Sequence, residues 1–109
     1  MPTEDNKRTI QRLLVERILR GPGQAPADQR ARAFENDPAV PDPLRPLLDK
    51  VAGSSARVTD ADFAAAMEAG FTDDQLFELV ICAAVGQSTR QYEAALAALA
   101  EATAGTETG

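Results

Sequence analysis

Apolar residues recur at helical spacing along most of this chain, beginning with a stretch from about Thr3 to Arg20. One side of that stretch is apolar and carries Ile10, Leu13, Leu14, Val15, Ile18 and Leu19. The pattern predicts an amphipathic helix whose charged side faces solvent, and a partner-binding helix is the functional alternative. Gly-Pro-Gly at 21–23 ends this helix, and a short helix is expected over Ala27–Glu35.

The middle of the chain is rich in proline. Four prolines between Pro38 and Pro46 exclude a regular element through Pro41. Asp42 is expected to be the N-cap of a third helix, with Pro43 in its first turn, where a missing N–H costs nothing. The inner side of that helix is expected to consist of Leu44, Leu47, Leu48 and Val51.

Two helices that begin with capping boxes are expected next. Thr59 is the expected N-cap of the first, with Asp62 at the third helical position. Its buried side is expected to hold Phe63, Ala66 and Met67. Gly70 has the place of a residue that ends a helix, and Thr72 with Gln75 repeats the capping-box arrangement at the start of the last helix.

The last helix is the most informative element. Its first half, Leu76–Val85, is apolar nearly all round and is interrupted only by Glu78 and Cys82, which predicts a place in the middle of a bundle. No stretch alternates at the period of a strand. The sequence therefore predicts an all-α fold, a compact bundle of about five helices with a long central C-terminal helix. It is expected to be a single domain over residues 1–102, followed by a disordered tail at 103–109.

The composition narrows the classes of function. A net charge of −6 disfavours nucleic acid or an anionic membrane as a partner. The chain has one cysteine and no histidine, which excludes an internal disulfide and His-dependent catalysis, so no metal or cofactor is expected. No apolar stretch has the length of a membrane span and no signal peptide is evident, so the expected location is cytoplasmic. The alanine-rich core is expected to be thin, which favours a homo-oligomer.

The stretch Val58–Leu99, with its step "AGFTDDQLFEL", resembles the carboxymuconolactone decarboxylase and alkylhydroperoxidase D-like superfamily. The resemblance implies an all-α fold and homo-oligomers, often trimers or hexamers. Peroxidase members carry Cys-x-x-Cys-x-x-x-His on the helix before the glycine, and counting back from Gly70 places these positions at Ser55, Val58 and Asp62. No Cys or His lies between Met1 and Ile81. The resemblance therefore implies a non-peroxidatic relative, and the decarboxylase branch, which relies on a His, is in doubt as well.

The candidate ligand-binding residues form a polar cluster on the last helix: Gln87, Ser88, Arg90, Gln91 and Tyr92. Gln87 and Gln91 continue the apolar line of Leu76, Val80 and Ala84, so they are expected to face inward or into a subunit contact. The cluster is either a structural hydrogen-bond network or the polar floor of a small-molecule pocket.

The remaining chemical candidates have simpler explanations. Cys82 is expected to be a small core residue, because no cation within a helical turn would lower its pKa and Glu78 would raise it; a redox or ligand thiol is the alternative. The acids Asp60, Asp62, Asp73 and Asp74 fall at two helix starts, where capping accounts for them without a metal.

Two classes of function remain. The first is a non-catalytic, oligomeric interaction or scaffold protein, which has a protein partner or a second copy of itself. The second is a small-molecule-binding protein or an unusual enzyme that uses the polar cluster without Cys or His chemistry. Thiol peroxidase activity is not expected, since it needs a pair of cysteines.

Overall fold

Helices account for every regular element in the computed structural model, which describes residues 3–108. Among these residues there are five α-helices and two short 3-10 turns, and there is no strand. The α-helices are α1 (Thr3–Arg20), α2 (Ala27–Glu35), α3 (Arg45–Gly53), α4 (Asp60–Glu68) and α5 (Asp73–Thr108). The predicted all-α class, with about five helices and a long C-terminal helix, is confirmed.

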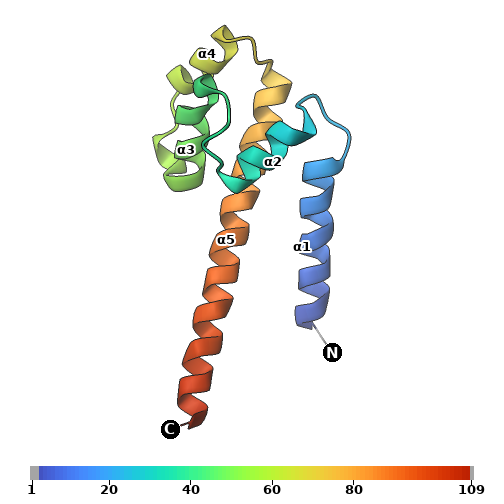
Figure 1. The fold of residues 1–109 in the computed structure, drawn as a ribbon, viewed down its shortest axis with the longest axis vertical. Coiled ribbons are helices and arrows are strands. Elements are labelled where there is room, and N and C mark those ends of the chain that lie inside the picture. Colours follow the sequence, from blue (N-terminus) through green and yellow to red (C-terminus); the bar gives the residue numbers. More distant parts are fainter. Residues whose placement is uncertain (1–2, 109) are drawn as a thin grey trace.

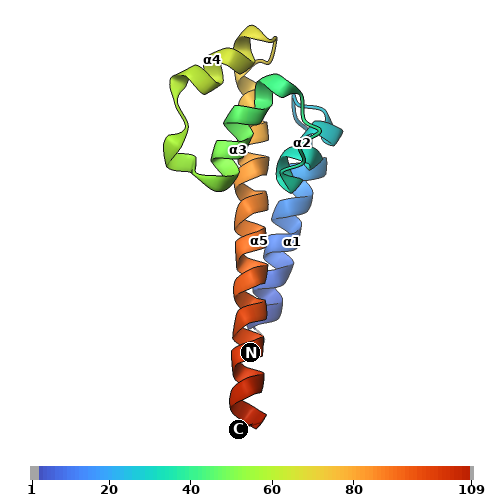
Figure 2. The ribbon, with the colours of Figure 1, turned by 60° about the vertical axis from the view of Figure 1, so that its left-hand side comes forward.

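The molecule has a globular end, the head, and an elongated end, the stalk. In the head, α2, α3 and α4 surround the first part of α5, up to Gly86 (Figure 1). The stalk consists of residues 87–108 of α5 and the N-terminal part of α1, which runs beside α5 in the opposite direction, and α5 extends past the start of α1 (Figures 1 and 2). The overall extents of 58 × 28 × 22 Å reflect this division.

The core lies where α5 passes through the head. Its largest fully buried side chains come from three elements and are Leu44, Leu47, Leu76, Leu79 and Cys82. Gly86 allows α2 to approach α5 closely, because a Cβ at this position would collide with the backbone carbonyl of Phe34. The C-terminus of α2 is thereby held against α5, and Asn36 ends α2 in the left-handed conformation with a φ of 54°.

The predicted helix punctuation is confirmed. Thr59 and Asp62 form a reciprocal capping box at the start of α4. The Thr72 N–H donates to Gln75 Oε1 at 3.0 Å, and the Gln75 N–H donates to Thr72 Oγ1 at 3.2 Å. Gly70 follows α4 with a φ of 107°, a conformation that side-chain-bearing residues rarely adopt.

Three local predictions are wrong. Asp42 makes no side-chain cap, because Asp42–Leu44 is a 3-10 turn and α3 begins only at Arg45. The ring of Pro46 would clash with the carbonyl of residue 42 inside an α-helix, which excludes an earlier start. Met67 is 47% exposed, because α4 is short and turns Ala66 rather than Met67 toward the core. Finally, α5 continues past residue 102 to Thr108, since residues 102–104 contain no helix-ending signal.

Candidate interaction surface

The apolar side of α1 is largely uncovered. The side chain of Ile10 is 66% exposed, that of Leu13 is 60% exposed and that of Leu14 is 50% exposed. A different side of α1 faces α5, where Gln11 Nε2 donates a hydrogen bond to Thr89 Oγ1 at 3.2 Å. The amphipathic helix predicted from the sequence is confirmed, but on its apolar side Ile18 packs against the core of its own chain whereas Ile10, Leu13 and Leu14 do not.

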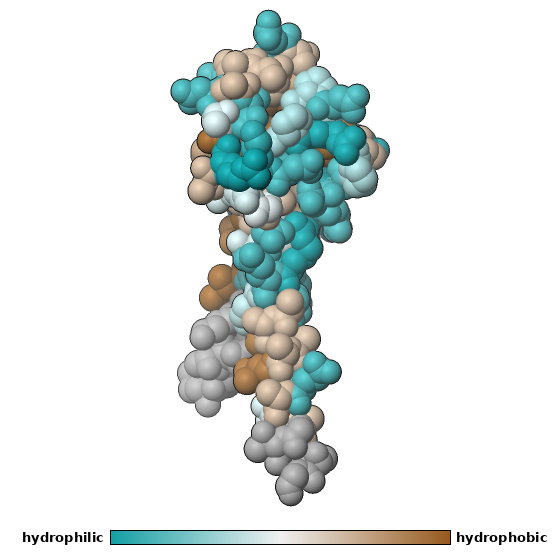
Figure 3. All heavy atoms as spheres, turned by 90° about the vertical axis from the view of Figure 1, so that its left-hand side faces the viewer, coloured by the Kyte–Doolittle hydropathy of each residue, from teal (hydrophilic) through white to brown (hydrophobic). Residues whose placement is uncertain are grey.

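A second apolar line runs along α5 beside α1. Its members recur at helical spacing and are Ile81, Val85, Tyr92, Leu96 and Leu99. Leu99 is exposed and the other four are half-buried. In Figure 3, hydrophilic surface lies between the head and the distal stalk, where apolar side chains return. The distal stalk therefore exposes apolar side chains to solvent.

One cavity joins the two apolar lines. It measures about 360 Å³ and is bordered by Leu14 and Ile18 from α1 and by Ile81 and Cys82 from α5. Both lines therefore open toward the same side of the molecule. We call this surface the α1–α5 face, and its exposed or half-buried members are Ile10, Leu13, Leu14, Ile18, Ile81, Val85, Tyr92, Leu96 and Leu99.

The loop between α1 and α2 is held to α5 by Glu78. Its Oε1 accepts hydrogen bonds from the backbone N–H groups of Gln24 and Ala25, both at 2.9 Å, and its Oε2 accepts from Gln24 at 2.8 Å. Burial raises the pKa of Glu78, but the hydrogen bonds from Ala25 and Gln24, together with the nearby charge of Arg30, outweigh it and hold that pKa below 4.5.

Arg30 completes this loop junction from the other side. Its Nη1 donates to the carbonyl oxygens of Ile18 at 3.1 Å and Gly21 at 2.7 Å, so it caps the C-terminal end of α1. The residue is only 7% exposed, and its Nε has no hydrogen-bond partner among the described residues. The sequence reasoning missed Arg30; the signal available was its place one helical turn before Ala33, on the side of α2 that is buried.

Cys82 is a core residue, as predicted. Its side chain is 1% exposed, and burial raises its pKa to about 11. Glu78 raises the pKa as predicted, and Arg30, which lies far from Cys82 in the sequence, lowers it. A thiol with so high a pKa is a poor nucleophile near neutral pH.

The predicted polar cluster does not converge on one site. Arg90 donates through Nη1 to the carbonyl oxygen of Phe34 at 2.7 Å and through Nη2 to Gln87 Oε1 at 3.1 Å, so this pair caps the C-terminus of α2. Ser88 Oγ donates to the carbonyl of Ala84 on its own helix at 3.0 Å. Tyr92 lies one helical turn beyond Ser88 but on a different side of α5 from Gln87 and Gln91, among the residues of the α1–α5 face.

Of the two directions expected for Gln87 and Gln91, inward or into a subunit contact, the inward one is wrong for Gln91, and the subunit contact stays a prediction. Gln91 is exposed and Gln87 is half-buried, because Ala84 on the same line is already exposed and the head covers α5 only up to Gly86. Gln87, Ser88 and Gln91 instead border an open groove of about 270 Å³ against the end of α3, and ligand binding there stays a prediction.

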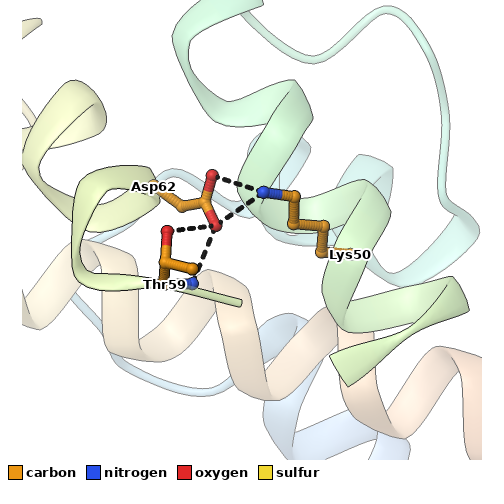
Figure 4. A network of polar contacts seen from close by, with 3 residues as sticks. All are labelled: Lys50, Thr59 and Asp62. Carbon is orange, nitrogen blue, oxygen red and sulfur yellow. Dashed lines mark hydrogen bonds and ion pairs between the residues drawn. The ribbon is translucent and has the colours of Figure 1, made fainter. Parts of the chain in front are cut away.

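The positions that correspond to the family's redox centre do not share a helix. Ser55 lies in a 3-10 turn, Val58 is extended, and only Asp62 belongs to α4. Asp62 accepts from the Thr59 N–H at 2.9 Å and pairs with Lys50 Nζ at 3.0 Å, which joins α4 to α3 (Figure 4). The Thr59 hydrogen bond and the Lys50 ammonium together lower the pKa of Asp62.

Searches for other kinds of site and for relatives gave no positive result. Within residues 3–108, no helix has the length and apolar character of a membrane span, and no cluster of His, Cys, Asp and Glu has the composition of a metal site. Comparisons with protein-family models, curated proteins and solved structures found no match to this chain.

Proposed function

We propose that this chain is a self-associating helical interaction protein and that the α1–α5 face is its interface. The observation that carries the proposal is the run of large apolar side chains on α1, Ile10, Leu13 and Leu14, which are half or more exposed. A helix that forms one wall of a stalk and leaves its apolar side in water gains stability when a partner covers that side.

The exposed apolar side chains by themselves roughly offset the cost of forming a dimer. Ile10, Leu13, Leu14 and Leu99 are 50% to 66% exposed. Full burial of a completely exposed side chain of this kind contributes about 1.5–3 kcal/mol, so covering the exposed fractions of all four on two copies contributes roughly 7–14 kcal/mol. Association costs about 4–15 kcal/mol, so the half-buried members of the α1–α5 face must also be engaged for a stable dimer.

The same proposal includes a cytoplasmic location and membership, as a non-peroxidatic relative, of the carboxymuconolactone decarboxylase and alkylhydroperoxidase D-like superfamily. The family membership is supported by the step from α4 through Gly70 to the capping box of α5. The positions of Ser55 and Val58 outside α4 count against it.

A small-molecule-binding protein is the second candidate. The groove beside Gln87, Ser88 and Gln91 is the observation that favours it, since amide and hydroxyl groups border it together with the C-terminal end of α3. Self-association is better supported, because Arg90 and Gln87 already hold each other and the α1–α5 face holds four of the six large exposed apolar side chains of the described residues, the other two being Met67 and Phe77 in the head.

The test is the mass of the protein in solution at tens of micromolar, measured by light scattering. The wild type is expected to be larger than a monomer, and the double variant Ile10→Gln with Leu13→Gln is expected to be monomeric without loss of helicity, because both residues are exposed. Met67→Gln, which removes an exposed apolar side chain from the head, is the matched control and is expected to keep the wild-type mass. A monomeric wild type, or a double variant of unchanged mass, would contradict the proposal.

A further inference from the structure

We infer that two copies pair through their α1–α5 faces about a two-fold axis parallel to the stalk. In this arrangement α1 of one copy packs against α5 of the other, and both heads lie at the same end of an antiparallel four-helix bundle. The inference rests on the proposed self-association and specifies the partner and its orientation. It draws on the charges of the helices, the position of the head and the register of the stalk.

The charges of the two stalk helices select this axis. Among its described side chains, α1 carries four basic residues and one acidic residue, whereas the part of α5 that lies level with α1 beyond Gly86, as far as about residue 97, carries one of each, Arg90 and Glu93. A two-fold axis parallel to the stalk places the basic α1 opposite this segment of α5, whose two charges balance. An axis that crosses the stalk places α1 against α1 and α5 against α5, which brings like charges together and is disfavoured.

The head does not obstruct this pairing. Leu79 and Ala83 are buried in the head, and Gly86 contacts α2, so the head covers that side of α5. Ile81 and Val85 lie about half a helical turn away from Ala83, on the side that remains half-buried. The α1–α5 face and the head therefore occupy different sides of α5, and two faces can meet while the heads stay apart.

The register of the stalk determines which residues meet. Gln11 is level with Thr89 through their hydrogen bond, and Cys82 Sγ lies 3.9 Å from the carbonyl oxygen of Ile18. A two-fold axis parallel to the stalk leaves every residue at its own level. Ile10 of one copy therefore faces the segment around Ser88 and Tyr92 of the partner subunit.

Cross-linking between singly substituted chains tests the arrangement. In a Cys82→Ala background, a tagged Ile10→Cys chain is mixed with an untagged Tyr92→Cys chain and treated with a short bis-maleimide. The expected result is a mixed cross-linked dimer that greatly exceeds the product from Ala31→Cys, which is exposed on α2 in the head. Ser88→Cys replaces Tyr92→Cys if the latter weakens the dimer.

The outcomes separate this inference from the proposal on which it rests. A sample that is dimeric by mass but whose mixed pair cross-links no more than the Ala31→Cys control overturns the arrangement and leaves self-association standing. Cross-links confined to pairs of α1 variants overturn it in favour of the crossing axis. A monomeric sample overturns the inference together with the proposed function.

Discussion

Replacing Glu78 with alanine is expected to lower the free energy of unfolding by about 1.5–4.5 kcal/mol. The carboxylate accepts the N–H groups of both Gln24 and Ala25. Ala25 is 2% exposed, so its N–H would lose its partner without gaining water, at a cost of about 1–3 kcal/mol. Gln24 is exposed and its N–H can be hydrated, so the second loss is smaller, about 0.5–1.5 kcal/mol.

A second substitution tests the close approach of Gly23 to the carboxylate of Glu78. A Cβ at Gly23 would lie 2.6 Å from Glu78 Oε1, so Gly23→Ala in the wild type displaces the carboxylate and is expected to destabilise the protein. Once Glu78 is alanine that obstacle is absent, and Gly23→Ala restricts only the unfolded chain. It is then expected to be neutral or stabilising by about 0.4–1 kcal/mol. The sign of the Gly23→Ala effect should therefore depend on Glu78.

Urea unfolding followed by circular dichroism gives the four free energies of this cycle. Glu101→Ala, an exposed acid on the same helix, is the control and is expected to change stability by less than about 0.5 kcal/mol. If Glu78→Ala costs no more than this control, or if Gly23→Ala has the same effect in both backgrounds, the loop junction does not stabilise the fold as argued.

Three other expectations concern single positions. Gly86→Ala should destabilise the protein by about 1–3 kcal/mol in urea melts, despite the better helix propensity of alanine, because α2 at Phe34 must move away; a stabilised variant would contradict the close contact. Cys82 should be alkylated at least about 100-fold more slowly in the native than in the urea-unfolded protein, because raising the pKa from 9.0 to about 11 lowers the fraction of thiolate by about 100-fold near neutral pH. Equal rates would show that the thiol is accessible. The lowered pKa of Asp62 means that its carboxylate stabilises the folded state. This stabilisation is fully present when the pH is above the ordinary pKa of 3.8, and it is lost as the pH falls through the lowered pKa. Urea midpoints of the wild type should therefore fall below about pH 5, and those of Asp62→Asn should fall less; parallel curves would refute the assignment.

The sequence predicted the elements whose causes are local. The helices Thr3–Arg20 and Ala27–Glu35 have the predicted bounds, because Gly-Pro-Gly and the proline-rich segment interrupt the chain at fixed places. The capping boxes at Thr59 and Thr72 were predictable because their hydrogen bonds join residues three apart. In each case the chemical partners are visible within one turn of sequence.

The contacts that shape the candidate surface are long-range, and these were missed. Glu78 was considered only as a neighbour of Cys82, although the N–H groups that it binds are more than 50 positions earlier in the chain. Gln87 and Gln91 were placed inward by extending an apolar line, which assumes that neighbours cover α5 along its whole length. Periodicity reports which residues share a side of a helix, but it does not report where the covering elements stop.

The continuity of α5 from head to stalk has a consequence for folding and for amide hydrogen exchange. Starting a helix is costly, whereas lengthening an existing one adds a hydrogen bond for each residue fixed. The buried first half of α5 therefore serves as the nucleus from which the alanine-rich residues beyond Gly86 extend, without a second nucleation step. Opening of the distal part needs no unfolding of the head, so protection should decline stepwise from Gly86 toward the C-terminus, and the midpoint of that decline would report how much of the stalk is covered.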